Sequence, residues 1–224
     1  MIYEIRALLS AETAAEVARE LGGAPFTDGR STAQGEARAA KNNLQLDQAH
    51  PTARRLGAVV LGALGNHEVV RAAILPRTVL PILFARYVEG MAYGEHFDLP
   101  IVGAGGGPVR TDLSMTVWLS PRDAYDGGEL VIETDGGSRS LKGGAGDAVI
   151  YPSTTLHRVT PVTRGERVVA VTWIQSLIRS AEHRQILLSL VQIASALQAR
   201  GDAEEELSRL RQTQYQLTRL WAEC

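Results

Sequence analysis

Two histidines and an aspartate are the residues of this sequence whose types and spacing best suit chemistry. His96 and Asp98 stand two positions apart, and His157 follows much later in the chain. Side chains at i and i+2 of a strand share a face, so His96 and Asp98 can approach one metal ion together. Two imidazoles and one carboxylate on one face of Fe(II) leave coordination positions open for a co-substrate and O₂. Taken singly, the first pair could be hydrogen-bonded at a strand end, and His157 could be a buried, satisfied histidine.

Arg167 adds a second kind of group to this hypothesis. It stands ten residues after His157, at the start of the next expected strand, and a hairpin would bring it to the same interior. An arginine that points inward needs an anion, because a buried unpaired guanidinium is very costly. A dicarboxylate co-substrate would supply that anion through a bidentate pair. The competing interpretation is an ordinary salt bridge to Glu129 or Glu166.

The central part of the chain is predicted to be β-rich. Short runs of β-branched and aromatic residues alternate there with Gly, Pro and Asp, which is typical of strands separated by turns. Seven or more such strands suggest an antiparallel sandwich or barrel of jelly-roll type, with helices on either side of it in the sequence. The expected strands are 84–89, 92–97, 113–119, 129–133, 148–151, 157–159 and 167–174.

Helices are predicted on both sides of this β-rich part. Ser10 is the expected N-cap of a helix that continues to Leu21, and apolar spacing predicts a helix over 52–71 with an interruption near Gly65. The polar segment 35–45 lacks a helical period and is predicted as a loop followed by an extended edge. After Ser176 the apolar period is helical, with a break at Gly201 and Asp202, which predicts a C-terminal helical hairpin.

These patterns divide the chain into three parts. Residues 1–80 would support the core with helices and strands, 81–178 would form the β core, and 179–224 would be a helical extension. The extension could pack on the core, cover the site as a lid, or form the contact of a homodimer. A brief flexible loop is expected over 103–107, which contains several glycines.

Composition limits the classes of partner. The chain has 224 residues, 45% of them hydrophobic, and a net charge of −2. It can therefore bury a sizeable core, and its charge points neither to nucleic acid nor to an anionic membrane. No stretch is apolar enough for a membrane span, so a cytoplasmic protein is expected. The single cysteine, Cys224, excludes an internal disulfide, and His50, His67 and His183 are assigned no role.

Several ordered motifs resemble one family. Arg86-Tyr-Val-Glu-Gly-Met-Ala-Tyr-Gly-Glu-His-Phe-Asp98 is followed by Arg110-Thr-Asp-Leu-Ser114, Tyr125-Asp-Gly-Gly-Glu-Leu130, the long segment Gly146 to Arg167, and Trp173-Ile-Gln-Ser176. Together they resemble the PKHD-type hydroxylases, a prolyl-4-hydroxylase-like branch of the Fe(II)/2-oxoglutarate dioxygenases. Phe26-Thr-Asp-Gly29 and Lys41-Asn-Asn-Leu-Gln-Leu46 extend the resemblance to the N-terminal part.

The resemblance implies a fold, a mechanism and a set of cofactors. The fold is a mainly β core, a double-stranded β-helix (jelly roll), with flanking helices. The resemblance makes His96, Asp98 and His157 the ligands of Fe(II), and it makes Arg167 the residue that binds the distal carboxylate of 2-oxoglutarate. It further implies L-ascorbate as the reductant that restores Fe(II), and hydroxylation of an unactivated C–H bond with release of succinate and CO₂. Because Asp98 is present, hydroxylation is favoured over halogenation. Phe97 and the Leu99-Pro100 pair depart from the smaller or more polar residues expected beside the ligands.

Further residues are candidates for lining the pocket around the co-substrate. They are hydroxyl, aromatic and basic side chains on the expected strands, where alternation places Ser114 with Thr116 and Arg167 with Trp173. Core packing or a satisfied hydroxyl is the alternative role for each. The candidates are Tyr87, Tyr93, Arg110, Ser114, Thr116 and Trp173.

Other functions are compatible with the same residues. A cupin-type module could bind a metal and 2-oxoglutarate as a sensor without turnover. A redox-inert Zn²⁺ site is disfavoured, and a hydrolase is a weaker alternative because no nucleophile elbow is recognisable. For an enzyme, the primary substrate could be a small molecule, an amino acid or a peptidyl residue. The loops 99–108 and 122–128 would select it.

Overall fold

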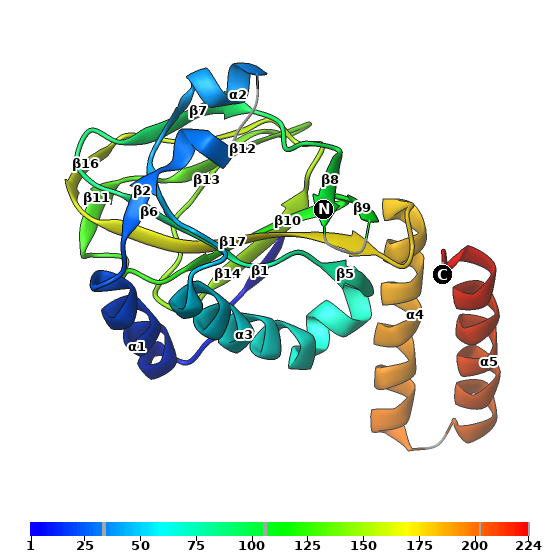
Figure 1. Ribbon diagram of the computed structural model, residues 1–224. Coiled ribbons are helices and arrows are strands. Elements are labelled where there is room, and N and C mark those ends of the chain that lie inside the picture. The colour runs from blue at the N-terminus through cyan, green and yellow to red at the C-terminus, as the bar shows by residue number, and fades with distance from the viewer. Residues whose placement is uncertain (33–34, 105–106, 202, 224) are drawn as a thin grey trace. The chain divides into compact units, whose positions relative to one another are not determined.

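The computed structural model describes residues 1–32, 35–104, 107–201 and 203–223 (Figure 1). The chain separates into two compact units. The core unit comprises Met1–Leu64 and Val79–Ile174, and the helical unit comprises Gly65–Thr78 and Gln175–Cys224.

The larger sheet of the core unit is antiparallel and gathers strands from most of the chain. Strand β10 lies inside this sheet and pairs with β14 on one side and β17 on the other. The order is β1 (Tyr3–Ile5), β14 (Ala148–Pro152), β10 (Leu113–Trp118), β17 (Arg167–Ser176), β6 (Leu83–Tyr87), β4 (Leu44–Leu46) and β2 (Phe26–Asp28).

A smaller antiparallel sheet faces the larger one (Figure 1). Its order is β13 (Gly137–Leu141), β12 (Leu130–Thr134), β15 (His157–Val159), β7 (Ala92–His96) and β3 (Lys41–Asn42). Two further pairs join β8 (Ile101–Ala104) to β9 (Gly107–Arg110) and β11 (Tyr125–Gly127) to β16 (Val162–Gly165). Two facing antiparallel sheets with these connections confirm the predicted jelly roll.

Helices α1 (Ala11–Gly22) and α3 (Pro51–Asn66) cover the outer face of the larger sheet (Figure 1). Every residue of β10 is buried, because helices lie on one face and the smaller sheet on the other. The predicted cap of α1 is confirmed, since the Ser10 hydroxyl accepts a hydrogen bond from the Thr13 backbone N–H.

The space between the two sheets is filled by apolar and aromatic side chains from both of them. This packing fixes the sheets face to face, so that polar side chains among them are held in set positions. The buried cluster comprises Leu83, Ala85, Tyr87, Trp118, Leu130, Ile132, Leu141, Val149, Tyr151, Val159, Val162 and Val169.

Three sequence predictions about local structure are wrong. The segment predicted as a loop from residue 35 begins with the short helix α2 (Gly35–Ala39), which follows the 3₁₀ helix η1 (Gly29–Thr32). The expected flexible loop over 103–107 contributes to the β8–β9 pair, although Gly105 and Gly106 lie outside the described residues. Strands β15 and β17 do not form a hairpin, because they belong to different sheets and β16 lies between them in sequence.

The helical unit contains the C-terminal hairpin that the apolar period predicts. Helix α4 (Ala181–Arg200) ends at Gly201, which adopts a left-handed conformation, and α5 (Glu204–Trp221) returns beside it (Figure 1). The His183 ring stacks on Trp221 at 4.0 Å between ring centroids. The unit also holds the π-helix η2 (Val70–Ile74) and β5 (Pro76–Val79), and the predicted interruption before η2 falls at His67. Asp202 lies outside the described residues.

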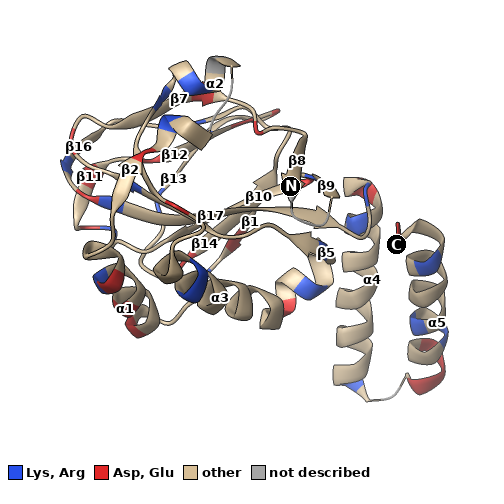
Figure 2. Ribbon diagram, viewed as in Figure 1, with Lys and Arg blue, Asp and Glu red and all other residues tan. Residues whose placement is uncertain are grey.

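Charge is distributed in both signs over the described surface. Figure 2 shows Lys and Arg as well as Asp and Glu in both the core unit and the helical unit. Among the described residues, no helix is long and apolar enough to cross a bilayer.

Candidate metal centre and co-substrate cavity

The three predicted metal ligands converge where β7 and β15 pair. His96 is the last residue of β7, His157 is the first of β15, and the two are register partners. Asp98 lies two residues beyond the end of β7, so the i, i+2 relation continues past the strand itself. One ligand atom from each side chain lies within 4.8 Å of the others. The structure therefore brings together all three residues that the sequence singled out.

Backbone carbonyls determine which nitrogen of each imidazole faces the centre. The Nδ1 atom of His96 lies 2.8 Å from the Gly94 carbonyl, and the Nδ1 of His157 lies 2.9 Å from the Thr155 carbonyl. A carbonyl can only accept, so each Nδ1 carries a proton. The Nε2 lone pairs are then available to a metal, in the tautomer that a ligating histidine needs.

Burial keeps the His96 imidazole neutral and ready for a metal. Together with the neighbouring His157, burial lowers the pKa of His96 to about 4. His96 also stacks on Tyr93, with ring centroids 3.6 Å apart. Two neutral imidazole nitrogens and one carboxylate oxygen fit a divalent iron ion and leave part of its coordination sphere to other ligands.

Arg167 lies in the wall of the same cavity and is fully buried. Its guanidinium lies over the Tyr87 ring, 4.9 Å from the ring centroid. Within the described residues it forms no ion pair, and its Nε has no hydrogen-bond partner. The alternative salt bridges are therefore wrong: Glu166 pairs with Arg86 at 2.9 Å, and Glu129 accepts from the Thr160 hydroxyl.

The cavity has a volume of about 320 Å³ and receives side chains from both sheets. Tyr87, Tyr93, Thr116 and Trp173 line it, as the sequence predicted. Ser114 does not line the cavity; it is buried beside Asp98 instead. Arg110 does not line the cavity either and pairs with Asp112. The indole Nε1 of Trp173, at the cavity wall, is buried without a hydrogen-bond partner among the described residues.

One polar wall of the cavity was missed by the sequence interpretation. Lys41, Asn43 and Gln45 are all buried and all line the cavity. They alternate at i, i+2 and i+4, which is the period of a strand and was the signal available in the sequence. Burial lowers the pKa of the Lys41 ammonium to about 8.

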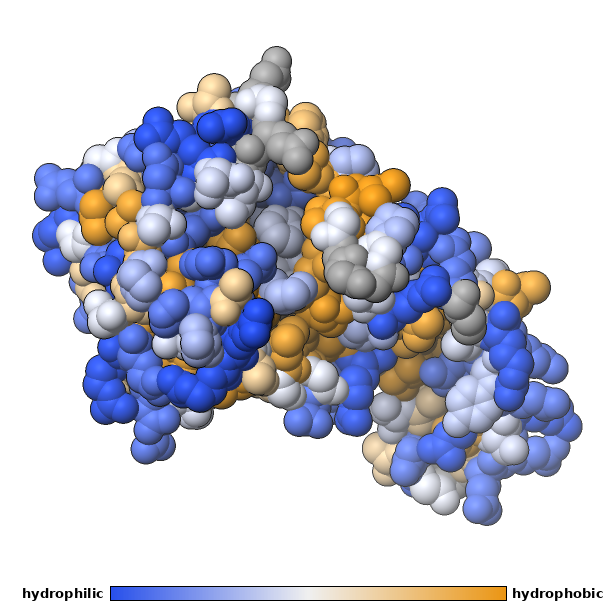
Figure 3. Space-filling model, viewed as in Figure 1, coloured by the Kyte–Doolittle hydropathy of each residue, from blue (hydrophilic) through white to orange (hydrophobic). Residues whose placement is uncertain are grey.

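The segment that begins between His96 and Asp98 forms an apolar rim. Phe97, Leu99 and Val102 line the cavity, yet Phe97 is 59% exposed and Leu99 is 45% exposed. Ile101 beside them is 60% exposed. Figure 3 shows apolar side chains gathered on the surface around β8. An exposed apolar rim around a cavity is typical of a binding site.

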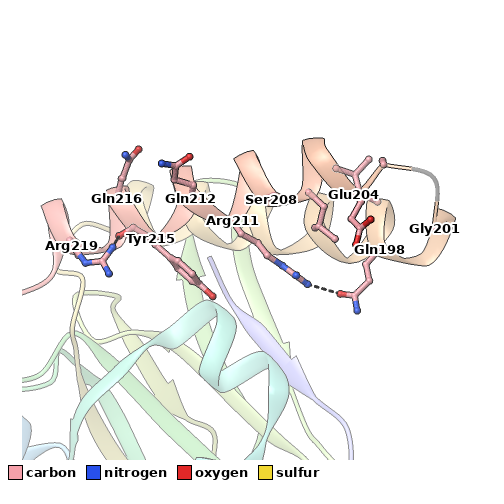
Figure 4. Close-up of a pocket in the computed structure, with 12 residues that line it drawn as sticks. Gln198, Gly201, Glu204, Ser208, Arg211, Gln212, Tyr215, Gln216 and Arg219 are labelled. Carbon is pink, nitrogen blue, oxygen red and sulfur yellow. Dashed lines mark hydrogen bonds between the residues drawn. The ribbon is translucent and has the colours of Figure 1, made fainter.

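The helical unit has a separate groove of about 970 Å³ along α4 and α5. Figure 4 shows Arg211 reaching across it to the side-chain oxygen of Gln198, a hydrogen bond of 2.9 Å. Its described lining residues include no histidine or cysteine and no carboxylate other than Glu204. The groove therefore offers no group of metal ligands.

The core fold is shared with solved oxygenase structures. A prolyl-4-hydroxylase from Pseudomonas putida aligns with 78% of this chain and 92% of its own, at a TM-score of 0.55 and 19% identity. HygX from Streptomyces hygroscopicus, solved with nickel and 2-oxoglutarate bound, aligns with 78% of this chain and 82% of its own, at a TM-score of 0.56 and 13% identity. Residues 82–175 match the 2OG-Fe(II) oxygenase superfamily. Together, the jelly roll and the His-Asp-His centre define an enzyme of the 2-oxoglutarate-dependent dioxygenase class.

Full-length relatives narrow the class to one family. A PKHD-type hydroxylase from Thioalkalivibrio sulfidiphilus is 46% identical over the whole of both chains. A second, from Alteromonas mediterranea, is 41% identical over 96% of this chain and 97% of its own. The chain belongs to the PKHD-type hydroxylases. The resemblance stated from the motifs is thereby confirmed.

Proposed function

We propose that this protein is a dioxygenase in which His96, Asp98 and His157 hold Fe(II) and Arg167 binds the distal carboxylate of 2-oxoglutarate. Its reaction would convert a substrate C–H bond, O₂ and 2-oxoglutarate into the hydroxylated product, succinate and CO₂. The substrate would be a small molecule or an amino-acid or peptidyl group. The observation that carries the proposal is the convergence of three metal-ligand atoms in a cavity whose wall contains a buried arginine without a carboxylate partner.

Each residue then has a defined task. Bound Fe(II) would supply the redox chemistry that activates O₂ at the expense of 2-oxoglutarate. The Gly94 and Thr155 carbonyls orient the two imidazoles, while Asp98 would be the carboxylate ligand of the metal, which disfavours halogenation. The guanidinium group of Arg167 matches a carboxylate in geometry and charge. Because the group is buried, the exclusion of water would strengthen its ion pair with the distal carboxylate of 2-oxoglutarate.

The remaining expectations belong to the same proposal. Tyr87, Tyr93, Ser114, Thr116 and Trp173 would support the bound metal and co-substrate. Residues 81–178 would carry the chemistry, 1–80 would support it, and 179–224 would form the helical extension. Ascorbate would restore Fe(II) after unproductive turnover, and the protein would act in the cytoplasm, where the extension could join two copies.

The test measures succinate formed from 2-oxoglutarate by anaerobically loaded Fe(II) protein after O₂ is admitted. Wild type is compared with His96→Ala, Arg167→Ala and, as a matched control, Arg164→Ala. Arg164 is exposed and pairs with Asp126, away from the cavity. Iron-dependent succinate is expected from wild type and the control, with none from His96→Ala and little from Arg167→Ala.

The outcomes separate the alternatives. Binding of iron and 2-oxoglutarate by calorimetry, with no succinate even after a substrate screen, would favour the sensor. Failure of wild type to bind either ligand would show that the metal-site assignment is wrong. Equal amounts of succinate from wild type and Arg167→Ala would show that Arg167 does not bind 2-oxoglutarate.

A further inference from the structure

Lys41 places a second buried cation in the cavity. Its ammonium donates a 2.8 Å hydrogen bond to the Thr32 hydroxyl, which in turn donates to the Gln45 side chain. It also lies 5.2 Å from the centroid of the Tyr93 ring. Among the ion pairs of the described residues, none includes Lys41. A buried ammonium with one neutral acceptor is costly, and it is better satisfied by an anion.

The charges of the loaded cavity leave one cation without a counterpart. Lys41, Asp98 and Arg167 are the charged side chains among the described residues that line it. Fe(II) and the dianion 2-oxoglutarate cancel each other, and Asp98 offsets one of the two basic side chains. One positive charge remains in a site of low dielectric constant, where an uncompensated charge is strongly unfavourable.

The cavity is polar on one wall and apolar on another. Lys41, Asn43 and Gln45 form the polar wall, whereas Phe97 and Leu99 form the apolar rim. The exposure of the rim shows that it is not packed by the core unit itself. A ligand that covers it would remove this apolar surface from water, which is favourable.

We propose that the primary substrate carries a single carboxylate bound by Lys41 and an apolar portion that packs on Phe97 and Leu99. This inference rests on the proposed function, because the charge count includes Fe(II) and 2-oxoglutarate. One negative charge on the substrate would neutralise the loaded cavity. A phosphate group would bring a charge of about −1.5 to −2 at neutral pH and leave the cavity with a net negative charge. The substrate class is therefore an apolar monocarboxylate, such as an acylated apolar amino acid.

Matched pairs of carboxylates and amides test this class. The probes are N-acetyl-L-leucine with N-acetyl-L-leucinamide, and the corresponding pairs built on alanine and phenylalanine. Each is titrated by calorimetry into protein loaded anaerobically with Fe(II) and 2-oxoglutarate. For at least the larger apolar pairs, wild type should bind the acid about tenfold or more tightly than the amide, because only the acid pairs with the buried ammonium.

Variants separate the two parts of the proposal. Lys41→Met keeps the length of the apolar stem but removes the ammonium. It should bind the acid no better than the amide, while its affinities for Fe(II) and 2-oxoglutarate stay within about twofold of wild type. Phe97→Ser alters an exposed residue and should weaken acid and amide to the same extent. The comparison of acid with amide in wild type needs no variant, so it stands if Lys41→Met fails to fold.

Three results would overturn the inference. Equal affinity of loaded wild type for acid and amide throughout the series, including no binding of either, would show that no carboxylate is selected. Loss of 2-oxoglutarate binding in Lys41→Met would assign Lys41 to the co-substrate. Failure of wild type to bind Fe(II) and 2-oxoglutarate would show that the proposed function is wrong, and with it the charge argument that depends on both ligands. The first two results would leave the proposed function intact.

Discussion

The Ser114 hydroxyl lies 2.5 Å from Oδ2 of Asp98 and donates to that carboxylate. The same hydroxyl lies 2.7 Å from the hydroxyl of Ser153, and both serines are buried. A hydrogen bond to an ionised acceptor is about twice as strong as one between neutral groups. Ser114 therefore fixes the orientation of the Asp98 carboxylate.

Ser114→Ala should weaken Fe(II) binding by about 10- to 100-fold, the range found for groups that orient a metal ligand. The affinity is measured by anaerobic calorimetry. Ser120→Ala is the matched control, since Ser120 is also buried but binds the Glu166 carbonyl and the Val168 amide. Both variants should lose about 1 kcal/mol of unfolding free energy. Equal iron affinity in the two variants would contradict a positioning role for Ser114.

Arg167→Gln should raise the dissociation constant of 2-oxoglutarate by about 30-fold or more, because truncating one member of a buried charge pair costs about 2–5 kcal/mol. The measurement is calorimetric titration of the iron-loaded protein without O₂. Arg164→Gln, three residues away and paired with Asp126 at the surface, should match wild type. If both variants bind 2-oxoglutarate alike, the distal carboxylate is held elsewhere.

Much of the core was accessible from local sequence patterns. The strand at 113–118 is a continuous run of buried residues that the pattern of branched and aromatic residues identifies, and the cap at Ser10 follows from hydrogen-bonding chemistry. His96 and Asp98 were predictable as partners because period-two alternation is a local property. Their meeting with His157 depended on strand pairing, which the motif resemblance supplied.

The errors concern relations between distant segments. Strands β15 and β17 follow each other closely in sequence, and nothing local indicates that they join different sheets. Lys41 and Gln45 show strand alternation, but the polarity of segment 35–45 indicated a loop and an extended edge, because the sequence does not show the cavity that they line. The β8–β9 pair was missed because its glycines weaken a strand pattern.

The stability of the metal-free protein should fall as pH decreases from 6.5 towards 4. Burial holds the pKa of His96 at about 4, below its ordinary value of 6.5. In this interval the unfolded chain binds a proton that the folded chain does not, so acidification favours unfolding, by up to about 3 kcal/mol. Above pH 6.5 the contribution of His96 is complete and constant.

Urea unfolding of metal-free wild type and His96→Gln, followed at intervals between pH 7 and pH 4.5, measures this contribution. The difference between the two proteins removes the effect of other titrating groups. Wild type should lose stability more steeply on acidification than His96→Gln. Parallel curves would show that His96 is not held neutral by its burial.

Gly128 leaves the space that the Arg167 side chain occupies. Its backbone is left-handed, with φ of +66°, and a Cβ placed on it would lie 2.9 Å from Cδ of Arg167. Gly90 has a similar φ of +82°, but a Cβ there would meet nothing within 4 Å. The two positions share the backbone cost of alanine, about 1–2 kcal/mol, and differ only in the contact.

Gly128→Ala should therefore lose about 1–3 kcal/mol more unfolding free energy than Gly90→Ala, because the added methyl overpacks the wall of the cavity. It should also weaken 2-oxoglutarate binding, since Arg167 must shift to admit the methyl, whereas Gly90→Ala should bind like wild type. Urea unfolding and calorimetry measure the two effects on the same samples. Unchanged 2-oxoglutarate affinity in Gly128→Ala would mean that the position of Arg167 tolerates displacement, and equal stability losses would mean that the wall relaxes around the added methyl.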